Sequence, residues 1–302
     1  MELGGVELRR SLVAAGYTDG ELRRGLRVGE LASVRRGAYV AGDDARLGDA
    51  AARHALLIAA ALPDAGAGSV VSHASAAVLL GLPTWSVPLG RVHLTRAQRT
   101  GGRIGATVHL HAAPLTAEEI VEVTGMAVTS PARTVVDLAR SLPFASAVAI
   151  ADAALRLGLV DEAGMGVAVD RAAGWRGSPA ARRVVAFADG RSESVGESRS
   201  RVALSRAGLP APVPQWEVRR DGMSIARVDF AWPEFRTVGE FDGRIKYGRL
   251  LRPGETPGDA VFEEKLREDR LRDNHLEVTR WTWHDLRDFA PVVARILRAF
   301  NR

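Results

Sequence analysis

Length and composition restrict what this chain can be. Its 302 residues are too many for one compact core and favour two or three domains. The absence of cysteine excludes disulfides, cysteine metal sites and thiol catalysis, and it fits the reducing cytoplasm. A net charge of +5 permits nucleic-acid binding without requiring it. Without a long apolar run or a signal-peptide pattern, we expect a cytoplasmic protein with no membrane partner.

Residues 1–42 carry the pattern of two short helices and a hairpin. Apolar residues at helical spacing predict a helix over 6–15, and Thr18 with Glu21 forms a capping box that predicts a second helix over 19–25. A turn at 35–37 separates two apolar segments and predicts a hairpin. Together these elements have the layout of a winged helix-turn-helix.

The region 43–160 predicts a mixed α/β middle domain. Its expected helices cover 50–62, 72–80, 132–139 and 145–157, and its expected strands cover 91–95 and 107–111. Residues 161–192 are rich in Gly and Ala, and we interpret them as a connector that contains helical pieces such as 180–188.

The pattern changes again over 193–302 and predicts a C-terminal α/β domain with the order α-β-β-β-α-β-α. The expected elements are helices over 195–207, 260–273 and 285–300, and strands over 215–219, 226–232, 237–241 and 276–282. The predicted fold class is therefore a multidomain α+β and α/β protein.

Acidic residues on neighbouring strands of this last domain suggest chemistry. Asp229 and Glu240 fall on consecutive predicted strands, where two carboxylates can share a divalent cation such as Mg²⁺ or Mn²⁺. Glu197 on the preceding helix can supply a third carboxylate. Lys246 is one of only two lysines among 41 basic residues, and it can stabilise charge that develops on a phosphate.

Three segments carry a resemblance to a known family: GESRSRVALSRAGL, RVDFAWPEFRTVGEFDGRIKY and EEKLREDRLRDNHLEVTRWTWHDL. They resemble the very-short-patch-repair-endonuclease-like branch of the PD-(D/E)XK nucleases, over about 192–300. The resemblance implies a restriction-endonuclease-like fold, with Glu197, Asp229 and Glu240 as metal ligands. Asp242 stands where that superfamily has its catalytic lysine, and Lys246 is the candidate replacement.

Several of these residues also have a simpler interpretation. Glu197 follows Ser194 by three positions and fits a helix cap. Asp242 and Gly243 fit a turn. Lys265, the second lysine, lies on a predicted charged helix face, where a solvated surface role is the better interpretation. The histidines at 54, 73, 93, 109 and 111 have no known metal-binding spacing, and we expect surface or hydrogen-bonded core positions for them.

The amino-terminal half resembles a second family. VVSHASAAVLLGLP, GRVHLTR and VTSPARTVVDLAR are similar to AbiEi antitoxins of type IV toxin–antitoxin systems, over about 1–155. The resemblance implies promoter-DNA binding by the winged helix and a nucleotidyltransferase toxin as partner. The residues carried over as DNA contacts are Arg23, Arg24, Arg27, Arg35 and Arg36.

Two functions remain open from the sequence. The first is a DNA-binding, metal-dependent endonuclease that hydrolyses phosphodiester bonds. The second is an antitoxin-like DNA-binding transcriptional regulator whose nuclease fold has lost catalysis, and Asp242 at the usual lysine position favours it.

Overall fold

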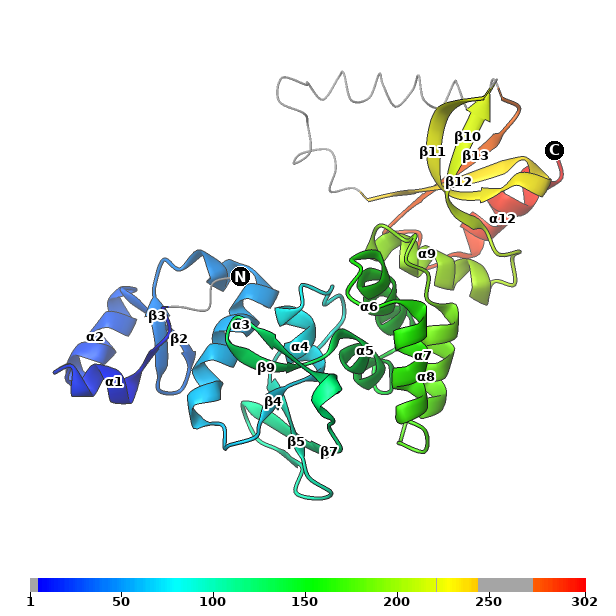
Figure 1. Ribbon diagram of the computed structural model, residues 1–302. Coiled ribbons are helices and arrows are strands. Elements are labelled where there is room, and N and C mark those ends of the chain that lie inside the picture. Colours follow the sequence, from blue (N-terminus) through cyan, green and yellow to red (C-terminus); the bar gives the residue numbers. More distant parts are fainter. Residues whose placement is uncertain (1–4, 221, 244–273) are drawn as a thin grey trace. The chain divides into compact units, whose positions relative to one another are not determined.

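The computed structural model describes residues 5–220, 222–243 and 274–302 (Figure 1). The chain is a mixed α/β protein that divides into two compact units, Met1–Ala188 and Asp189–Arg302. The predicted helix over 260–273 and both lysines, Lys246 and Lys265, lie outside the described residues.

The chain begins with two helices and a small antiparallel sheet. Its elements are β1 (Glu7–Leu8), α1 (Arg9–Ala14), α2 (Asp19–Val28), β2 (Leu31–Arg35) and β3 (Ala38–Ala41), with the strand order β1-β3-β2. The predicted capping box is confirmed, because Thr18 Oγ1 accepts from Glu21 N and Glu21 accepts from Thr18 N. This helix extends beyond the predicted end to Val28, and Gly29 closes it in a left-handed conformation.

A six-stranded mixed sheet follows, in the order β6-β7-β5-β4-β9-β8. The strands are β4 (Val70–Val71), β5 (Val92–Ala97), β6 (Arg103–Ile104), β7 (Val108–Ala113), β8 (Ile120–Val123) and β9 (Met126–Thr129). The accompanying helices are α3 (Ala50–Ala61) and α4 (His73–Leu79), with short 3-10 turns η1 (Ala45–Gly48), η2 (Leu62–Asp64) and η3 (Ala117–Glu119). Ile58, Val71, Leu94 and Val128 join helix and sheet in one buried core.

Four further helices belong to the first unit: α5 (Pro131–Ala139), α6 (Phe144–Arg156), α7 (Glu162–Arg171) and α8 (Ser178–Phe187). The region 161–192, expected as a connector, supplies α7 and α8, which contact α5 and α6. α7 was not predicted, because two glycines, Gly164 and Gly166, weaken its helical pattern.

A buried ion network holds the start of α5. The Arg133 guanidinium lies 2.8 Å from Asp137 Oδ2 and 3.1 Å from Glu119 Oε2, and all three residues are buried. The same guanidinium stacks over the Trp175 ring at 4.7 Å. Burial raises the pKa of Asp137, and Arg133 opposes that rise. The segment VTSPARTVVDLAR therefore has a structural purpose, since a buried charge must be matched by partners.

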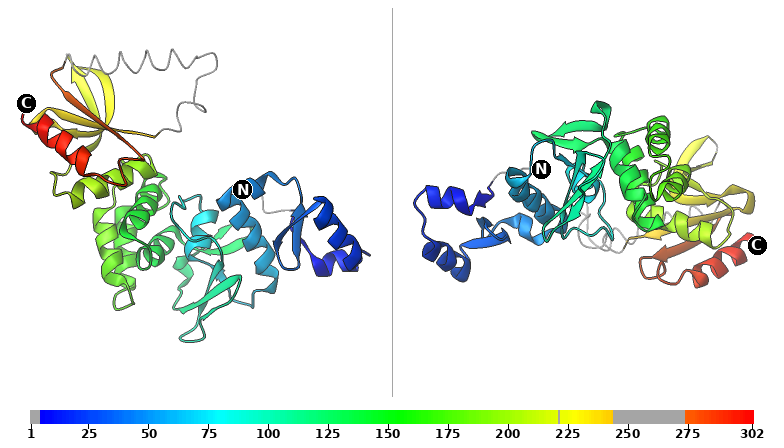
Figure 2. Two further views of the ribbon diagram at one scale, coloured as in Figure 1. Left: turned by 180° about the vertical axis from the view of Figure 1, so that it is seen from behind. Right: turned by 90° about the horizontal axis from the view of Figure 1, so that it is seen from below.

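The second unit is a four-stranded sheet with helices on one face. It contains α9 (Val195–Arg206), β10 (Val213–Arg220), β11 (Met223–Trp232), β12 (Thr237–Asp242), β13 (Glu277–Thr282) and α12 (Ala290–Phe300), with the 3-10 turn η4 (Pro233–Phe235) between β11 and β12. The sheet order is β10-β11-β12-β13, antiparallel except for the last pair. Phe230 and Trp281 pack against Leu204 of α9 and Ile296 of α12. Figures 1 and 2 show α12 lying along the sheet.

The last helix starts five residues later than predicted. Residues 283–287 form turns, because Asp285 accepts hydrogen bonds from Thr282 N and Thr282 Oγ1. Asp288 then accepts from Ala290 N, and Pro291 occupies the first turn of α12. Within the residues that the structure describes, none of the helices is long and apolar enough to cross a membrane.

We expect Asp137→Ala to lower the free energy of unfolding of the first unit by about 3–5 kcal/mol, because it leaves the Arg133 charge buried without its closest partner. Asp170→Ala is the matched control, since Asp170 is 81% exposed and lies 4.0 Å from Arg182; we expect it to cost less than about 0.5 kcal/mol. Hydrogen exchange of peptides from α5 and α6, recorded at increasing urea concentrations, measures the change in the free energy of unfolding for each variant. Equal losses in the two variants would contradict a stabilising role for the network.

Candidate active site

The amino-terminal end of α9 places the first predicted ligand. Ser194 Oγ accepts from Glu197 N and donates to Glu197 Oε1 at 2.7 Å, and Glu193 N donates to Glu197 Oε2. Ser194 therefore caps α9, while the backbone bond to Glu197 comes from Glu193, one residue before the position that a capping box would use. Capping uses only part of its acceptor capacity, because a carboxylate has about four lone-pair sites.

A glycine lets this helix end approach the sheet. A Cβ atom at Gly196 would lie 1.9 Å from the Phe241 ring, so only glycine fits there. Further along α9, Ser200 Oγ accepts from Trp281 Nε1 at 2.7 Å, which fixes the helix on β13. The spacing of Gly196, Glu197 and Ser200 thus determines where the Glu197 carboxylate lies.

Asp229 ties β11 to β12 just beyond their regular pairing. The regular pairing of these strands begins at Phe230 and Gly239. One residue beyond, Asp229 Oδ2 accepts from Phe241 N at 2.8 Å, so a side chain replaces the backbone acceptor. Asp229 is half-buried.

Gln215 joins the two carboxylates and was missed in the sequence. Its Nε2 lies 2.9 Å from Glu197 Oε2 and 3.3 Å from Asp229 Oδ1, so one amide donor reaches both residues. The Gln215 backbone has a φ of 52°, a left-handed conformation that is costly for a residue with a side chain. A single glutamine between prolines and a tryptophan gives no recognisable pattern, and only the folded strand reveals it.

The Glu197 carboxylate is buried beside a second carboxylate. Burial raises the pKa of Glu197, and the nearby Asp229 carboxylate raises it further, while the hydrogen bonds from Glu193, Ser194 and Gln215 oppose the rise. Two neighbouring carboxylates repel when both are ionised, and a divalent cation relieves that repulsion.

The remaining predicted residues of this site lie on β12. Glu240 is buried, and its Oε2 lies 3.6 Å from Arg280 Nη2 on the neighbouring strand. Asp242 is half-buried at the end of β12, and side-chain alternation places it on the same face as Glu240. Oxygen atoms of Glu197, Asp229 and Glu240 do not all lie within 4.8 Å of one another, so these three carboxylates do not surround one shared ion in this structure.

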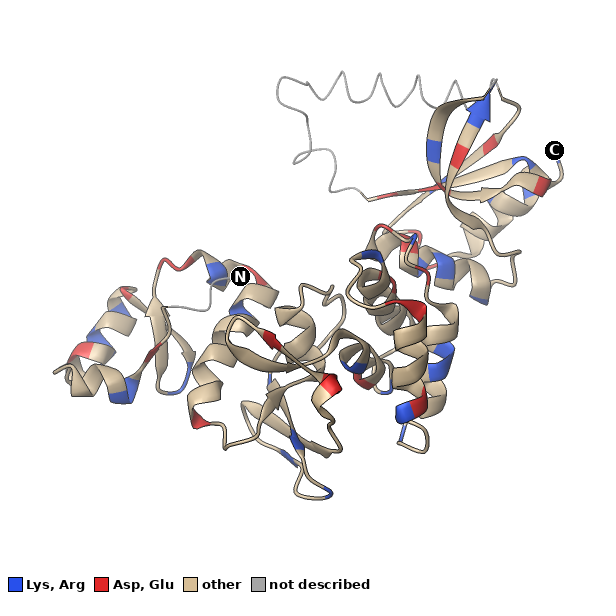
Figure 3. Ribbon diagram, viewed as in Figure 1, with Lys and Arg blue, Asp and Glu red and all other residues tan. Residues whose placement is uncertain are grey.

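Four of the five arginines predicted to contact DNA are exposed. Arg23, Arg24 and Arg27 lie on α2, where Figure 3 shows basic residues along the helix, and Arg36 lies in the turn between β2 and β3. Arg35 differs, because it is half-buried, forms an ion pair with Asp64 and donates to the Ala60 carbonyl. The structure gives Arg35 a role inside the fold.

Four of the five histidines lie together, which their spacing along the chain did not predict. His73, His93, His109 and His111 gather beside β5 and β7, with the ring centroids of His73 and His109 each 3.8 Å from that of His111. The two strands run in parallel register with His93 opposite His109, so their side chains share one face. The repeated letters V-H-L in both strands were the available signal. His54 fits the expectation, because it is buried and bonded to Ser75 Oγ.

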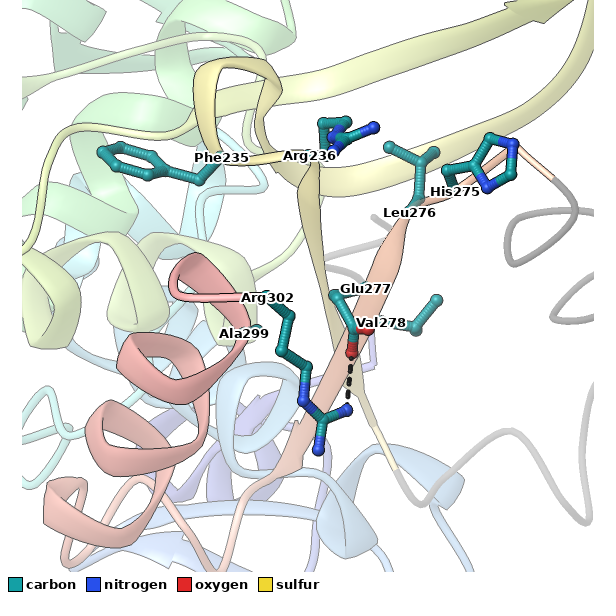
Figure 4. Close-up of a pocket in the computed structure, with 8 residues that line it drawn as sticks. All are labelled: Phe235, Arg236, His275, Leu276, Glu277, Val278, Ala299 and Arg302. Atoms are coloured by element: carbon teal, nitrogen blue, oxygen red, sulfur yellow. Dashed lines mark hydrogen bonds and ion pairs between the residues drawn. The ribbon is translucent and has the colours of Figure 1, made fainter.

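A pocket of about 530 Å³ lies elsewhere in the second unit, and the predicted residues do not line it (Figure 4). Its walls come from η4, the start of β13 and the end of α12, including Phe235 and Leu276. An exposed ion pair between Glu277 and Arg302, 3.1 Å apart, lies in its wall. Because β12 and β13 run parallel, this pocket is at the opposite strand ends from Asp242.

The close approach at Gly196 can be tested with a matched pair of helix glycines. We expect Gly196→Ala to destabilise the second unit by about 1–3 kcal/mol, since the new methyl group would overlap the Phe241 ring. Gly166→Ala on α7 meets no atom within 4 Å and should stabilise the first unit by up to about 1 kcal/mol. Hydrogen exchange in urea measures the free energy of unfolding of each unit separately. Stabilisation of the second unit by Gly196→Ala would contradict the overlap with the Phe241 ring.

Comparisons with known proteins place the chain among relatives. No protein-family model matches it. A solved structure of the Rv2827c protein from Mycobacterium tuberculosis has a TM-score of 0.39 and 16% identity, covering 72% of this chain and 84% of its own. The uncharacterized protein Rv2248 of M. tuberculosis H37Rv, and MT2308 of strain CDC 1551, are each 34% identical over 214 residues, which is 71% of this chain and 74% of theirs. The chain therefore belongs to the same protein family as Rv2248.

Proposed function

We propose that the chain is a DNA-binding protein whose second unit hydrolyses phosphodiester bonds with the help of a divalent cation. The observation that carries this proposal is the Glu197–Asp229 pair, held together by the Gln215 amide at the point where β11 and β12 leave regular pairing. The sequence resemblance to PD-(D/E)XK nucleases supports the same assignment.

The proposed chemistry follows from the carboxylate oxygens of Glu197 and Asp229, which are suitable ligands for a divalent cation. Bound Mg²⁺ or Mn²⁺ would polarise a phosphate oxygen and lower the pKa of a coordinated water. Glu197 and Asp229 would hold the cation, with Gln215 fixing their orientation, and Glu240 would be a third ligand. In the hydrolysis, water attacks phosphorus and loses a proton to solvent, the bond from phosphorus to the leaving sugar oxygen breaks, and that oxygen takes up a proton from water.

The positive charge expected after Glu240 has two candidate sources. Asp242 occupies the position where related nucleases have lysine, and Lys246 lies outside the described residues. The second candidate is Arg280, whose Nη2 lies 3.6 Å from Glu240 Oε2. With Glu240 bound to a metal ion, the Arg280 guanidinium could stabilise negative charge on the phosphate.

A pair of Glu→Gln variants tests the nuclease proposal. We expect Glu240→Gln to slow Mg²⁺-dependent cleavage of plasmid DNA at least about 100-fold, since a neutral amide is a poor ligand for Mg²⁺. Glu234→Gln changes an exposed residue of η4 in the same way and should leave the rate unchanged. The proposal would be wrong if the wild-type protein showed no cleavage of DNA with Mg²⁺ or Mn²⁺. It would also be wrong if Glu240→Gln and Asp229→Ala cleaved DNA at the wild-type rate.

A second candidate is a DNA-binding regulator of the antitoxin type with an inactive nuclease fold. Two observations favour it: Asp242 replaces the usual lysine, and Arg280 already forms an ion pair with Glu240. Its partner would be a nucleotidyltransferase toxin. Sequence-specific DNA binding without cleavage would select this candidate over the first.

Both candidates need α2 to contact DNA. We expect the double change Arg23→Ala with Arg24→Ala to weaken DNA binding and to lower the salt slope, the dependence of log K on log salt, by about 2, because two phosphate contacts are lost. Arg182→Ala with Arg183→Ala removes an adjacent pair of exposed arginines from α8 and serves as control. Fluorescence anisotropy at several salt concentrations measures the slopes, and equal slopes for both double variants would exclude a contact through α2.

A further inference from the structure

The histidine cluster of the first unit is a site for which the proposed function has no use. Among residues 5–220, 222–243 and 274–302, His73, His93 and His111 are the one group of three side chains whose possible metal-binding atoms all lie within 4.8 Å of one another. Each of the three is half-buried, so the group is fixed by the fold and still reaches solvent.

The nitrogen atoms of two rings already lie at a separation that suits a shared ion. His93 Nδ1 is 3.0 Å from His111 Nε2, so one proton now joins the rings. Two ligands of a tetrahedral zinc ion, each bonded at about 2.0–2.1 Å, lie about 3.3 Å apart. A metal ion can therefore replace that proton with only a small movement of the rings.

Surrounding groups hold His73 and His93 in place. Ser72 Oγ lies 3.0 Å from His73 Nδ1 and accepts from Thr95 Oγ1, which fixes it between the helix and β5. The backbone N of His93 donates to Ser75 Oγ, and this hydrogen bond holds His93 of β5 against α4. Partners of this kind hold metal-binding histidines in position in known sites.

The backbone at His73 is strained in a way that places its ring in the cluster. His73 begins α4 with a φ of 50°, although residues with side chains avoid this region. Its ring stacks on that of His111, at a centroid distance of 3.8 Å. Such strain concentrates at binding and catalytic sites, where the surrounding structure maintains it.

The surroundings of the three rings favour their neutral form. Burial lowers the pKa of His93 to about 4 and that of His111 to about 2, and it holds the pKa of His73 well below its usual range. Nearby imidazoles and arginines lower these values further.

From this geometry we infer that His73, His93 and His111 bind a divalent transition-metal ion of the zinc class, with one coordination position left open to water. Three imidazoles without a carboxylate suit Zn²⁺, Co²⁺, Ni²⁺ or Cu²⁺ and are a poor donor set for Mg²⁺. The site is thus chemically distinct from the carboxylate pair of the second unit. His109 covers the ring of His111 and is not a ligand in this arrangement.

Titration with Zn²⁺ of protein carrying no histidine tag tests the inference. We expect one ion per chain by calorimetry, a higher melting temperature with Zn²⁺, and a tetrahedral ligand-field spectrum with Co²⁺. Histidine ¹⁵N resonances of the unaltered protein should shift for residues 73, 93 and 111 and stay unchanged for 275 and 284. Absence of binding, or shifts confined to 275 and 284, would overturn the site.

Variants then separate the ligands from their surroundings. His111→Ala should weaken Zn²⁺ binding more than 100-fold, and Ser72→Ala by about 10–100-fold, since it removes only an orienting partner. His284→Ala, an exposed histidine of the second unit, should bind as the wild type does. Wild-type affinity in His111→Ala would show that the ion binds elsewhere. Because the ¹⁵N measurement needs no substitution, a variant that fails to fold still leaves the inference testable.

Discussion

Charged and titratable side chains that leave water must be matched by other groups of the protein, and this constraint organises both units. In the first unit the Arg133 guanidinium is buried between Glu119 and Asp137 and anchors α5, the helix around which α6, α7 and α8 gather. In the second unit the Asp229 carboxylate accepts from Phe241 N and thereby holds β12 where its pairing with β11 ends.

The carboxylate pair and the histidine cluster share two features. Each brings together groups of the same kind: two carboxylates around Gln215, and imidazoles around His111. Each also contains a residue with a left-handed backbone, Gln215 in one and His73 in the other. Backbone strain of this kind concentrates at binding and catalytic sites, and this supports the two proposals.

Much of the architecture could be predicted from the sequence, because local signals were strong. The capping box of Thr18 and the apolar pattern of α6 produced elements close to those predicted. Weak signals failed where structure depends on distant contacts: β4 is a two-residue strand, and α7 carries glycines at helical positions. The helix predicted over 285–300 begins only at Ala290, because side-chain hydrogen bonds of Asp285 and Asp288 hold the preceding residues in another conformation.

The sites were harder to predict than the elements. Glu197 and Asp229 could be predicted to lie together because both belong to segments that resemble the nuclease family. The structure brings both carboxylates within hydrogen-bond distance of the Gln215 amide. The histidine cluster needed the register between β5 and β7, which placed His93 opposite His109. Strand register depends on pairing across the sheet, and spacing along the chain does not reveal it.

The most direct test of this account is anomalous diffraction from crystals soaked separately in Mn²⁺ and Zn²⁺. Oxygen donors should select Mn²⁺ and imidazoles Zn²⁺. We predict a Mn²⁺ peak beside the carboxylates of Glu197 and Asp229 and a Zn²⁺ peak among His73, His93 and His111. Absence of Mn²⁺ from the carboxylate pair, with DNA also present, would contradict the central claim that this pair holds a catalytic cation.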